Sequence, residues 1–447
     1  MDVKGPEPLE QTLYFLYNLL LLLFLPFAFG ILSWRWVVQP SYRKGIWERF
    51  GIHPKDIGKK EKGERLFWIH AVSVGEVLAS VPLIHAIRKK FPKDRLILST
   101  VTVTGQEIAL QKIPEVDRMI YCPFDFPWAV QRVVEILRPN LFIFLETELW
   151  PNLLRCLKKK GVASLMVNGR ISPGSFRNYR WARVFFRRVL GQVSTFSVQT
   201  ERDARFLQEL GADPLTIECM GNMKYDQSFK VFGEDELNSL RQNLGIEKKT
   251  MVFVVGSTHE KEEASLLDQF GEMVSRWGSF VMILAPRHLD RLPSIETLLE
   301  QRKIPYFRKT DLLALRRKGD PGLGKTGVIL LDTLGELSSY YRLATVVFVG
   351  GSLVPIGGHN ILEPAAYGKF SYFGPYMHNF SEISCLMKER GGGVEVENVK
   401  ELVEKIETIL KKPAELERRG REAFKVVEEN RGAVEKNMKL IEKFITP

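Results

Sequence analysis

A carboxylate at the end of an apolar strand is the first sign of chemistry in this sequence. The run LFWIHAV begins at Leu66 and leads directly into Ser73, Gly75 and Glu76. A carboxylate in that position can act as a general base toward a hydroxyl group. The same spacing fits a capping box, in which Ser73 and Glu76 bind the first free amides of a helix. These residues alone leave both interpretations open.

The densest group of glycines and polar residues follows a strand in the second half of the chain, in FVGGSLVPIGGHNILEPAAYG. Paired glycines let the backbone approach a ligand closely. We expect a helix to begin at Asn360 and to include the next three residues, Ile361, Leu362 and Glu363. Ordinary tight turns would also explain the glycines. The concentration of glycines with His359, Asn360 and Glu363 at one strand end favours a binding site.

The loop LLDTLGELSSYY repeats this arrangement after another strand. We expect Thr333 to cap a helix whose first turn contains Gly335, Glu336 and Leu337. The free amides and the positive dipole end of such a helix suit a phosphate group. Thr333 and Glu336 also have capping-box spacing, so a purely structural role is an equal alternative.

A third strand end carries a basic residue. LAPRHLDR places Pro286, Arg287 and His288 directly after the strand FVMILA. An arginine there can bind a phosphate or a carboxylate through two hydrogen bonds. Three strand ends with groups suited to phosphate, ribose and base together predict a nucleotide-sugar donor site.

These groups must be positioned by a parallel sheet in each half of the chain. Short β-branched and aromatic runs alternate with longer helical stretches, first from residue 66 to about 220 and again from 251 to about 396. Such alternation predicts an α/β fold of two doubly wound, Rossmann-like domains that face a cleft. Ligands of such sheets bind beyond the carboxyl ends of the strands. The boundaries we expect are an anchor at 1–36, a first domain at 37–228, a connection at 229–249, a second domain at 250–411 and C-terminal helices at 412–447 that could cross back to the first domain.

The N-terminal segment differs in composition from the rest of the chain. Residues 13–34 contain no charged side chain and are long enough to cross about 30 Å of hydrocarbon, so we expect one transmembrane helix. A cleaved signal peptide fits poorly, because the apolar stretch is long and no cleavage site follows it. Most nearby lysine and arginine residues follow the segment: Arg35, Arg43, Lys44 and Arg49, against Lys4 before it. The positive-inside rule therefore predicts a single-pass inner-membrane protein whose domains lie in the cytoplasm.

Charge and motif context narrow the possible partners. The formal net charge of +11 favours an anionic partner such as nucleic acid, a phosphorylated ligand or an acidic lipid. Four cysteines and seven histidines lack the spacing of a zinc site, so we expect no bound metal. GDPGLGKT, residues 319–326, matches a phosphate-loop pattern letter for letter. A phosphate loop must follow a strand and open a helix, and here the order is reversed, so we do not expect an ATPase.

Several motifs carry a resemblance to a known family. GSTHEKEE, APRH, DTLGEL, GGS and GGHNILEPAAYGK resemble the nucleotide-binding half of GT-B glycosyltransferases. HAVSVGE, TELWPNL, NGRIS and GNMKYD are similar specifically to the lipid A Kdo transferases, which transfer 3-deoxy-D-manno-octulosonic acid (Kdo). The resemblance covers almost the whole chain. It implies a GT-B fold and inverting transfer of Kdo from CMP-Kdo to the lipid A precursor, a tetraacyl glucosamine disaccharide bisphosphate, in lipopolysaccharide core biosynthesis.

The resemblance also implies roles for individual residues. Glu76 would be the general base, and Glu148 and Lys224 would stabilise the transition state. The residues that would hold CMP follow three strands and are Pro286, Arg287, His288, Gly335, Glu336, Leu337, Asn360, Ile361, Leu362 and Glu363. CMP-Kdo is a substrate, so no cofactor is expected. From the residues alone, Glu148 and Asn360 could cap helices and Lys224 could be a solvated side chain.

A basic aromatic segment suits a membrane and a lipid acceptor. SFRNYRWARVFFRRVLGQ places Arg177, Arg180 and Arg183 among aromatic residues, and we expect one helix that binds anionic headgroups. Arg170 could meet a lipid phosphate. A nucleic-acid surface is less favoured, because the neighbouring anchor makes a bilayer the nearer polyanion. The partners we expect are CMP-Kdo, the lipid A precursor and inner-membrane lipids, without nucleic acid.

Ser73 and Gly75 complete the predicted acceptor side, with Gly75 leaving room for Glu76 to approach the acceptor hydroxyl. Two other functions stay open. One is a GT-B transferase or a 2-epimerase that uses a UDP-sugar, whose donor would carry a diphosphate. The other is a non-catalytic, membrane-anchored lipid-binding protein.

Overall fold

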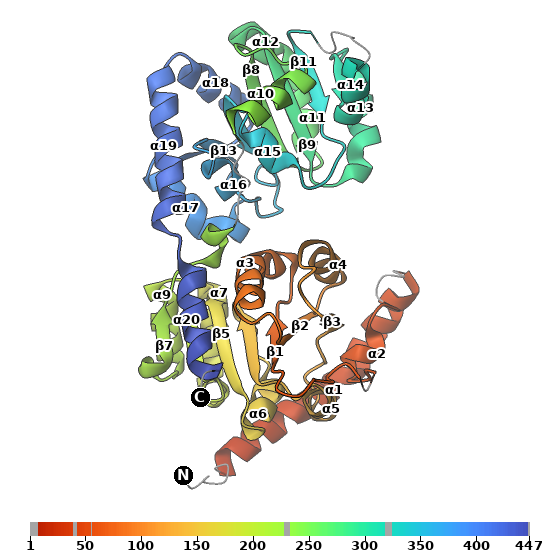
Figure 1. The fold of residues 1–447 in the computed structure, drawn as a ribbon, viewed down its shortest axis with the longest axis vertical. Helices are drawn as coiled ribbons and strands as arrows, with labels where there is room; N and C mark the ends of the chain where they lie inside the picture. Colours follow the sequence, from red (N-terminus) through yellow and green to blue (C-terminus); the bar gives the residue numbers. More distant parts are fainter. Residues whose placement is uncertain (1–7, 39–42, 55, 228–232, 318–323, 446–447) are drawn as a thin grey trace. The chain divides into compact units, whose positions relative to one another are not determined.

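The computed structural model describes residues 8–38, 43–54, 56–227, 233–317 and 324–445. The chain forms two compact units (Figure 1). Unit 1 consists of Met1–Gln227 together with Arg431–Pro447, and unit 2 consists of Ser228–Asn430. The long C-terminal helical stretch is therefore divided between the units, with α19 (Pro413–Glu429) in unit 2 and α20 (Ala433–Ile445) in unit 1.

Unit 1 is built on a parallel sheet of seven strands in the order β3-β2-β1-β4-β5-β6-β7. The strands are β1 (Leu66–His70), β2 (Arg95–Thr100), β3 (Arg118–Tyr121), β4 (Leu141–Leu145), β5 (Ala163–Gly169), β6 (Thr195–Val198) and β7 (Ile217–Cys219). Alternate residues of the central strands point to opposite faces, and both faces are buried: Trp68 and Phe142 join one core cluster, and Phe67 and Ile143 join the other. Burial on both faces explains why these strands read as continuous apolar runs.

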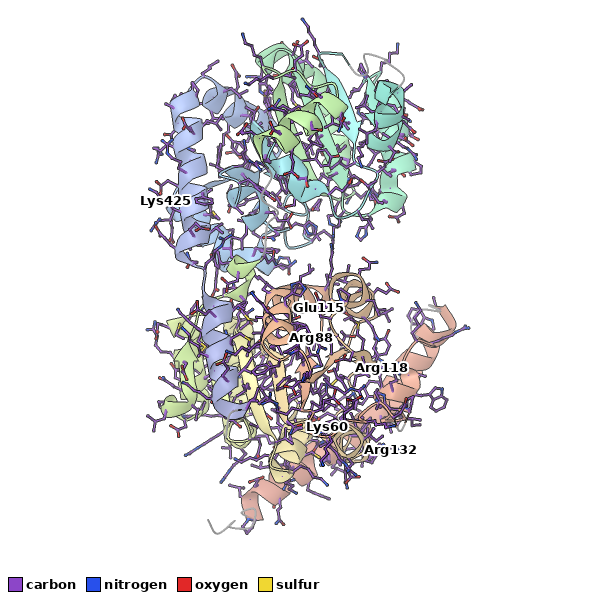
Figure 2. All side chains as sticks on the ribbon, in the orientation of Figure 1. Lys60, Arg88, Glu115, Arg118, Arg132 and Lys425 are labelled. Atoms are coloured by element: carbon purple, nitrogen blue, oxygen red, sulfur yellow. The ribbon has the colours of Figure 1, made fainter. Side chains whose placement is uncertain are left out.

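Helices cover both faces of this sheet (Figure 1). They are α1 (Pro8–Val38), α2 (Ile46–Arg49), α3 (Val74–Lys90), α4 (Val103–Lys112), α5 (Pro127–Leu137), α6 (Pro151–Lys159), α7 (Pro173–Trp181), α8 (Arg183–Leu190), α9 (Glu201–Leu210) and α20, with short 3₁₀ turns η2 (Pro214–Thr216) and η3 (Met223–Asp226). Charged side chains such as Arg132 of α5 are exposed on the outer helix faces (Figure 2). Charge is thus kept at the solvent side of the helical layers.

Unit 2 repeats the architecture with a second parallel sheet of seven strands, in the order β10-β11-β9-β8-β12-β13-β14. The strands are β8 (Met251–Thr258), β9 (Phe280–Pro286), β10 (Tyr306–Arg308), β11 (Gly327–Leu330), β12 (Val346–Val349), β13 (Ser371–Phe373) and β14 (Gly393–Glu395). Its helices are α10 (Glu234–Asn243), α11 (Glu262–Asp268), α12 (Phe270–Trp277), η4 (Leu289–Arg291), α13 (Leu292–Gln301), α14 (Lys309–Arg317), α15 (Leu337–Tyr341), α16 (Leu362–Ala365), η5 (His378–Phe380), α17 (Ser381–Glu389), α18 (Val399–Leu410) and α19. The predicted fold of two doubly wound parallel sheets is confirmed.

The strand order locates the two places where a ligand is expected. In unit 1 the order reverses between β1 and β4, and in unit 2 it reverses between β8 and β12. Crevices at such switch points, beyond the carboxyl ends of the strands, are where doubly wound sheets bind ligands. Glu76 follows β1, and the glycine-rich segment after Val349 follows β12.

Three local predictions need correction or qualification. The basic aromatic segment forms two helices, α7 and α8, that meet at Ala182 rather than one helix. The helix expected to begin at Asn360 begins at Leu362 instead. Residues 319–323 of the phosphate-loop-like segment lie outside the described residues. Among those that are described, α1 has one stretch, Pro8–Pro26, that is long and apolar enough to cross a membrane.

Candidate active site

Glu76 lies in the first turn of α3, just beyond the carboxyl end of β1. Its side chain is only 6% exposed. The Ser73 hydroxyl donates a hydrogen bond to Glu76 Oε1 at 2.8 Å, and the Val72 amide donates to Glu76 Oε2 at 2.9 Å. Ser73 occupies the N-cap position but its hydroxyl accepts no amide of the helix. The reciprocal capping box is therefore not formed, and the serine instead fixes the orientation of the carboxylate.

Two more carboxylates lie near Glu76 at the same edge of the sheet. Glu146 and Glu148 follow β4, the strand that pairs with β1 across the switch point. Burial raises the pKa of Glu76 to about 8, and the carboxylates of Glu146 and Glu148 add to this effect. Burial, with a contribution from Glu146, also raises the pKa of Glu148 to about 6. Groups with perturbed pKa values in a crevice are typical of catalytic acids and bases.

Lys224 brings a positive charge to this cluster. Its Nζ atom lies 3.9 Å from Glu146 Oε1. The turn that carries Lys224 is held by Asn222, whose side chain accepts from the Lys224 amide, and by Asn168, whose side chain accepts from the Met223 amide at 2.9 Å. The three predicted catalytic residues, Glu76, Glu148 and Lys224, therefore belong to one cluster in unit 1.

Glu146 was not predicted, although it links Lys224 to the other carboxylates. Its backbone has a positive φ of 54°, which is uncommon for a residue other than glycine. Its amide donates to the carbonyl of Val167 on β5. A strained backbone held in this way at a functional edge is a hint of a role in the site. The only signal in the sequence was its position directly after the strand LFIFL.

The predicted acceptor residues lie on the surface of unit 1. Arg177, Arg180 and Arg183 are exposed, and Arg170 is half-buried. Phe176, one of the aromatic residues among them, packs on Phe206 with ring centroids 4.2 Å apart, whereas Trp181 is 90% exposed. A Cβ atom added at Gly75 would meet only the Ser73 hydroxyl, at 3.9 Å, so the space beside Gly75 is open.

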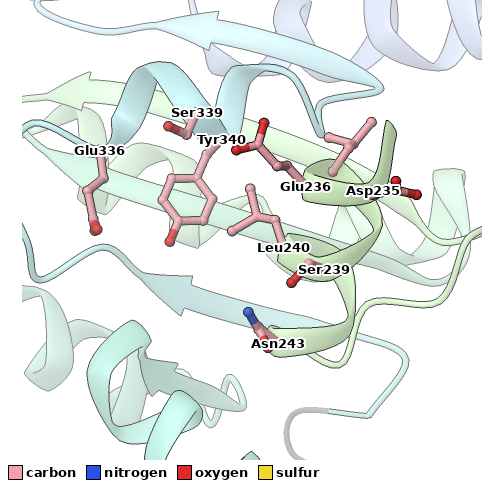
Figure 3. A pocket seen from close by; sticks show the side chains of 9 residues that line it. Asp235, Glu236, Ser239, Leu240, Asn243, Glu336, Ser339 and Tyr340 are labelled. Atoms are coloured by element: carbon pink, nitrogen blue, oxygen red, sulfur yellow. The ribbon is translucent and has the colours of Figure 1, made fainter. Parts of the chain in front are cut away.

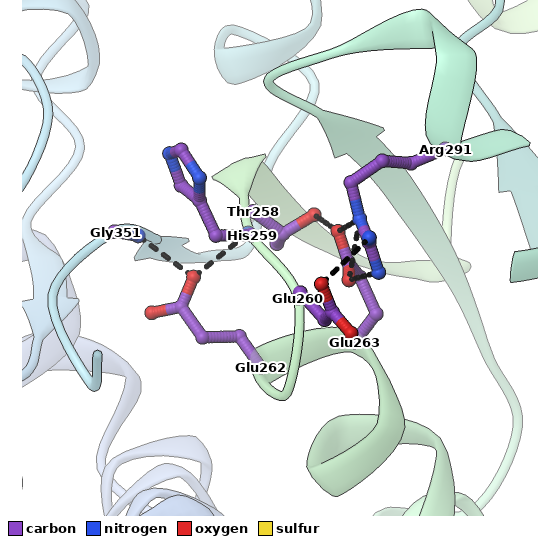
Figure 4. A network of polar contacts seen from close by, with 7 residues as sticks. All are labelled: Thr258, His259, Glu260, Glu262, Glu263, Arg291 and Gly351. Atoms are coloured by element: carbon purple, nitrogen blue, oxygen red, sulfur yellow. Dashed lines mark hydrogen bonds and ion pairs between the residues drawn. The ribbon is translucent and has the colours of Figure 1, made fainter. Parts of the chain in front are cut away.

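In unit 2, the glycine-rich loop after β12 is organised by a buried carboxylate, Glu262. Glu262 accepts hydrogen bonds from the amides of Gly351 (2.7 Å), Ser352 (3.1 Å) and Leu353 (2.9 Å). It also accepts from the His259 amide at 3.0 Å, which joins the loops after β8 and β12 (Figure 4). Gly351 has a φ of +66°, a conformation that favours glycine. Glu262 was not predicted.

The neighbouring acid, Glu263, has a different partner. Arg291 donates to Glu263 from Nη2 at 2.9 Å, and the Thr258 hydroxyl donates to Glu263 at 3.1 Å (Figure 4). Glu263 is fully buried, so this bond network fixes the start of α11 against η4. The two acids serve the framework of the loops rather than their ligand-facing side.

Histidine and arginine side chains gather beyond β8, β9 and β12. His259 Nε2 and His359 Nε2 lie 2.8 Å apart, and their rings are stacked. His288 packs edge-on against His259. Burial, followed by the positive charge of Arg287, lowers the pKa of His359 to about 3. Burial, followed by the charges of His288 and Arg287, also lowers the pKa of His259. Both shifts favour neutral rings, which lets one of the two facing nitrogens donate and the other accept.

The loop after β11 differs from its prediction. Glu336 occupies the N-cap position of α15, which begins at Leu337, and Gly335 has a φ of +83°. Thr333 does not cap the helix, because its hydroxyl donates to the Glu336 carboxylate. Lys309 also donates to Glu336 at 2.7 Å. The Glu336 side chain is thus already paired, and its backbone is the part best suited to a ligand.

The segment from Asn360 to Glu363 is a turn that leads into the short helix α16. Asn360 accepts from the Leu362 amide at 3.0 Å, and its side-chain nitrogen donates to Glu363 at 3.4 Å. The side chains of Ile361 and Leu362 are fully buried in the core. Only their backbone atoms are suited to contact a ligand, whereas Asn360 and Glu363 are partly exposed.

An open pocket lies between α10 and α15, on the side of the loop after β11 that carries the Glu336 side chain (Figure 3). Its lining includes the acidic residues Asp235, Glu236 and Glu336. An acidic lining repels a phosphate group, so this pocket does not suit an anionic ligand.

Sequence comparisons identify the family of this chain. The sequence profile described as 3-deoxy-D-manno-octulosonic-acid transferase (kdotransferase) matches residues 44–227. The 3-deoxy-D-manno-octulosonic acid transferase of Rickettsia felis is 30% identical over 85% of this chain and 79% of that protein. This chain belongs to the Kdo transferase family. It is accordingly a glycosyltransferase that acts in lipopolysaccharide biosynthesis.

One further sequence relative and one solved structure are similar to this Kdo transferase over most of its length. A bifunctional glycosyltransferase/methyltransferase of Fusobacterium nucleatum is 36% identical over 78% of this chain, and the chain spans 53% of that protein's length. A glycosyltransferase structure from Rickettsia africae superposes with a TM-score of 0.55, covering 86% of this chain and 99% of that one, at 12% identity. The structural likeness supports the GT-B fold.

Proposed function

We propose that the protein transfers Kdo from CMP-Kdo to the lipid A precursor, with inversion at the anomeric carbon and with Glu76 as general base. The observation that carries the proposal is the Glu76 carboxylate, which is held by Ser73 and the Val72 amide at the switch point of unit 1. Its raised pKa of about 8 suits a group that accepts a proton from a hydroxyl near neutral pH.

The proposed reaction is a single displacement. The acceptor hydroxyl oxygen forms a bond to the anomeric carbon, the bond from that carbon to the phosphate oxygen breaks, and CMP leaves with the electron pair. The hydroxyl proton passes to Glu76. Lys224 supplies positive charge near the developing negative charge, and Glu148 stabilises the positive charge that develops on the sugar.

Unit 2 is proposed to hold CMP-Kdo. Arg287 would bind the single phosphate, together with amides of Gly335 to Leu337, and Glu363 would accept hydrogen bonds from the ribose hydroxyls. Asn360 and the backbone of Ile361 and Leu362 would complete the nucleotide contacts with Pro286 and His288. A metal ion is not needed in this scheme, because a monophosphate leaving group can be neutralised by these cationic and amide groups.

The acceptor is proposed to be a lipid at the cytoplasmic face of the inner membrane. The exposed arginines of α7 and α8 suit anionic headgroups and phosphate groups. We include Ser73, Gly75 and Arg170 on this acceptor side.

The proposal is tested with the detergent-solubilised full chain, CMP-Kdo and tetraacylated lipid A precursor. We expect CMP release together with a mass increase of the lipid by Kdo, and an unchanged rate in the presence of EDTA. Transfer from UDP-sugars but not from CMP-Kdo would show that the donor is a UDP-sugar and would contradict the proposal. Lipid binding without CMP release would favour the non-catalytic alternative.

Replacing Glu146 should change the pH dependence of the reaction. The Glu146 carboxylate helps to raise the pKa of Glu76, so Glu146→Gln should lower that pKa. Because the base must be ionised, the rise of kcat/KM with pH should then occur at lower pH, and activity at pH 7 should increase. The hydrogen bond from Ser73 opposes the raised pKa, so Ser73→Ala should move the profile to higher pH. Shifts of both variants in the same direction would contradict this account of the cluster.

A further inference from the structure

The chain contacts unit 1 at two places, through the first part of helix α1 and again through residues that follow the helix. Tyr14 is almost fully buried, its hydroxyl donates to the Pro151 carbonyl at 3.3 Å, and the guanidinium of Arg155 lies 4.1 Å above its ring. Glu10 forms an ion pair with Arg155 at 3.4 Å. These contacts fix the N-terminal part of α1 on α6.

The contacts continue one turn further along the same helix face. The Tyr17 hydroxyl donates to the buried carboxylate of Asp125 at 2.9 Å, and Asn152 donates to Asn18 at 2.7 Å. Tyr17 also stacks on Phe185 of α8. The Asp125 carboxylate also accepts the amides of Asn152 and Leu153, so the Tyr17 hydroxyl adds a third hydrogen bond to a group that is already fixed in unit 1. Moving α1 away would break this bond and the bond from Asn152 to Asn18, and would expose the buried Tyr14 ring, so the attachment is strong.

The chain is attached to unit 1 again soon after α1 ends. Arg49 donates to the Val101 carbonyl at 2.6 Å and packs over the ring of Tyr121, and Glu48 accepts from the Tyr121 amide at 2.8 Å. Lys44 pairs with Glu107. These contacts place α2 and Lys44 against β3, α4 and the loop after β2.

The distances available to the chain decide the topology. From Asn18 to Val38 the helix is about 30 Å long, which equals the hydrocarbon thickness of a bilayer. From Val38 to Arg43 five residue steps reach at most about 18 Å. A helix that crossed the bilayer would carry one of its attached sides to the far face, while unit 1 stays on the near face. The two attachments are incompatible with a spanning helix.

The remaining face of α1 has the composition of a lipid contact. Its exposed apolar side chains are Phe15, Leu16, Leu19, Leu20, Leu22, Leu23 and Phe24. Helix α8, which packs against α1 through Phe185, joins α7 at a tip where Trp181 is 90% exposed beside Arg180 and Arg183. In Figure 1, α1 runs along the end of unit 1 past α6 and α5. An apolar helix face next to exposed basic and tryptophan side chains is typical of an interfacial helix.

We propose that α1 does not cross the membrane but lies in its plane, inserted into one leaflet, with its polar face fixed on unit 1. The exposed apolar face of α1 contacts the acyl chains of an anionic bilayer. This inference rests on the proposed membrane location but not on the proposed reaction, and its tests need no enzymatic activity.

Cysteine labelling distinguishes the two topologies. Two variants are made in a full chain whose four native cysteines are replaced by serine. Pro8→Cys places a thiol at the start of α1, and Lys44→Cys places one after its end. A membrane-impermeant maleimide should label both in inverted membrane vesicles and neither in intact spheroplasts. Labelling of the Pro8→Cys protein in spheroplasts, or in neither preparation, would overturn the proposal. Leu215→Cys, at an exposed site of unit 1, controls for the accessibility of the folded domain.

A cross-link tests whether the attachment persists in the bilayer. In the same cysteine-free background, Asn18→Cys with Asn152→Cys should form a disulfide on oxidation in membranes, before any detergent is added. The matched pair Leu20→Cys with Asn152→Cys should not, since Leu20 lies on the exposed face. Cross-linking of the first pair only after solubilisation would show that α1 leaves unit 1 in the membrane and would refute the in-plane arrangement.

Discussion

Glu76→Gln is expected to lower kcat for Kdo transfer by about 1000-fold, because the amide cannot accept the proton of the acceptor hydroxyl. Glutamine has nearly the same shape and can still accept a hydrogen bond from Ser73 or the Val72 amide. Binding of CMP-Kdo should therefore be unchanged. The measurement is kcat and KM with both substrates varied.

The same variant should be more stable than the native protein at high pH. The pKa of Glu76 rises from an ordinary 4.5 to about 8 on folding, so the folded state binds the proton more tightly than the unfolded state does. Below pH 4.5 the carboxyl is protonated in both states and costs nothing. Between pH 4.5 and 8 the unfolded state loses this proton while the folded state keeps it, so the stability falls over this range, and the loss is complete once the pH has risen through 8. Each pKa unit corresponds to about 1.4 kcal/mol, and with coupling among three carboxylates we expect a gain of roughly 2 kcal/mol for Glu76→Gln at pH 9.

Thermal unfolding at pH 4 and at pH 9 checks this expectation. Glu76→Gln should match the native protein at pH 4 and should unfold several degrees higher at pH 9. Glu209→Gln, an exposed change on α9, serves as the matched control and should have no effect at either pH. Full activity in Glu76→Gln would assign the base to another group, and equal stabilisation at both pH values would contradict the role of burial.

Glu262→Ala is expected to destabilise unit 2 by roughly 3 kcal/mol or more and to weaken CMP binding at least tenfold. The carboxylate accepts four backbone amides, three of them in the loop after β12. Removing it leaves these amides buried without a partner, and the loop that leads to Asn360 and Glu363 loses its fixed shape. Calorimetric titration with CMP and thermal unfolding measure the two effects.

A neighbouring acid provides the comparison for Glu262. Glu260 is 78% exposed and forms a 3.4 Å ion pair with Arg291, so Glu260→Ala should change neither stability nor CMP affinity appreciably. Glu262→Gln should resemble Glu262→Ala, because its NH₂ group would point at backbone amides that need an acceptor. Normal CMP affinity in Glu262→Ala would show that the loop is held by other contacts.

The sheet architecture could be predicted from the sequence because a strand that is buried on both faces consists almost entirely of apolar residues. Trp68 and Phe67 face opposite core clusters, and the run ends where the chain leaves the sheet, next to Glu76. Candidate residues at strand ends were therefore found by type and position. The identity of the family came from the motifs at those same strand ends.

Residues that act through contacts distant in sequence were harder to predict. Glu146 matters because β4 pairs with β1, a fact that no local pattern contains. Glu262 is one of several acids in HEKEE, and only the position of the loop after β12 determines which of them is buried. Thr333 fits the spacing of a helix cap, but its hydroxyl bonds the Glu336 side chain instead of an amide. Spacing alone does not distinguish these two hydrogen bonds.

The face by which α1 is fixed to unit 1 also bears on how this enzyme would meet its acceptor. Tyr14, Tyr17 and Asn18 hold the helix against unit 1. With α1 in the leaflet, as proposed, unit 1 could not move away from the lipid surface by the length of a flexible tether. Enzyme and acceptor would then diffuse in two dimensions. The number of acceptor molecules per unit area of membrane, rather than their concentration in the surrounding volume, would govern how often they meet.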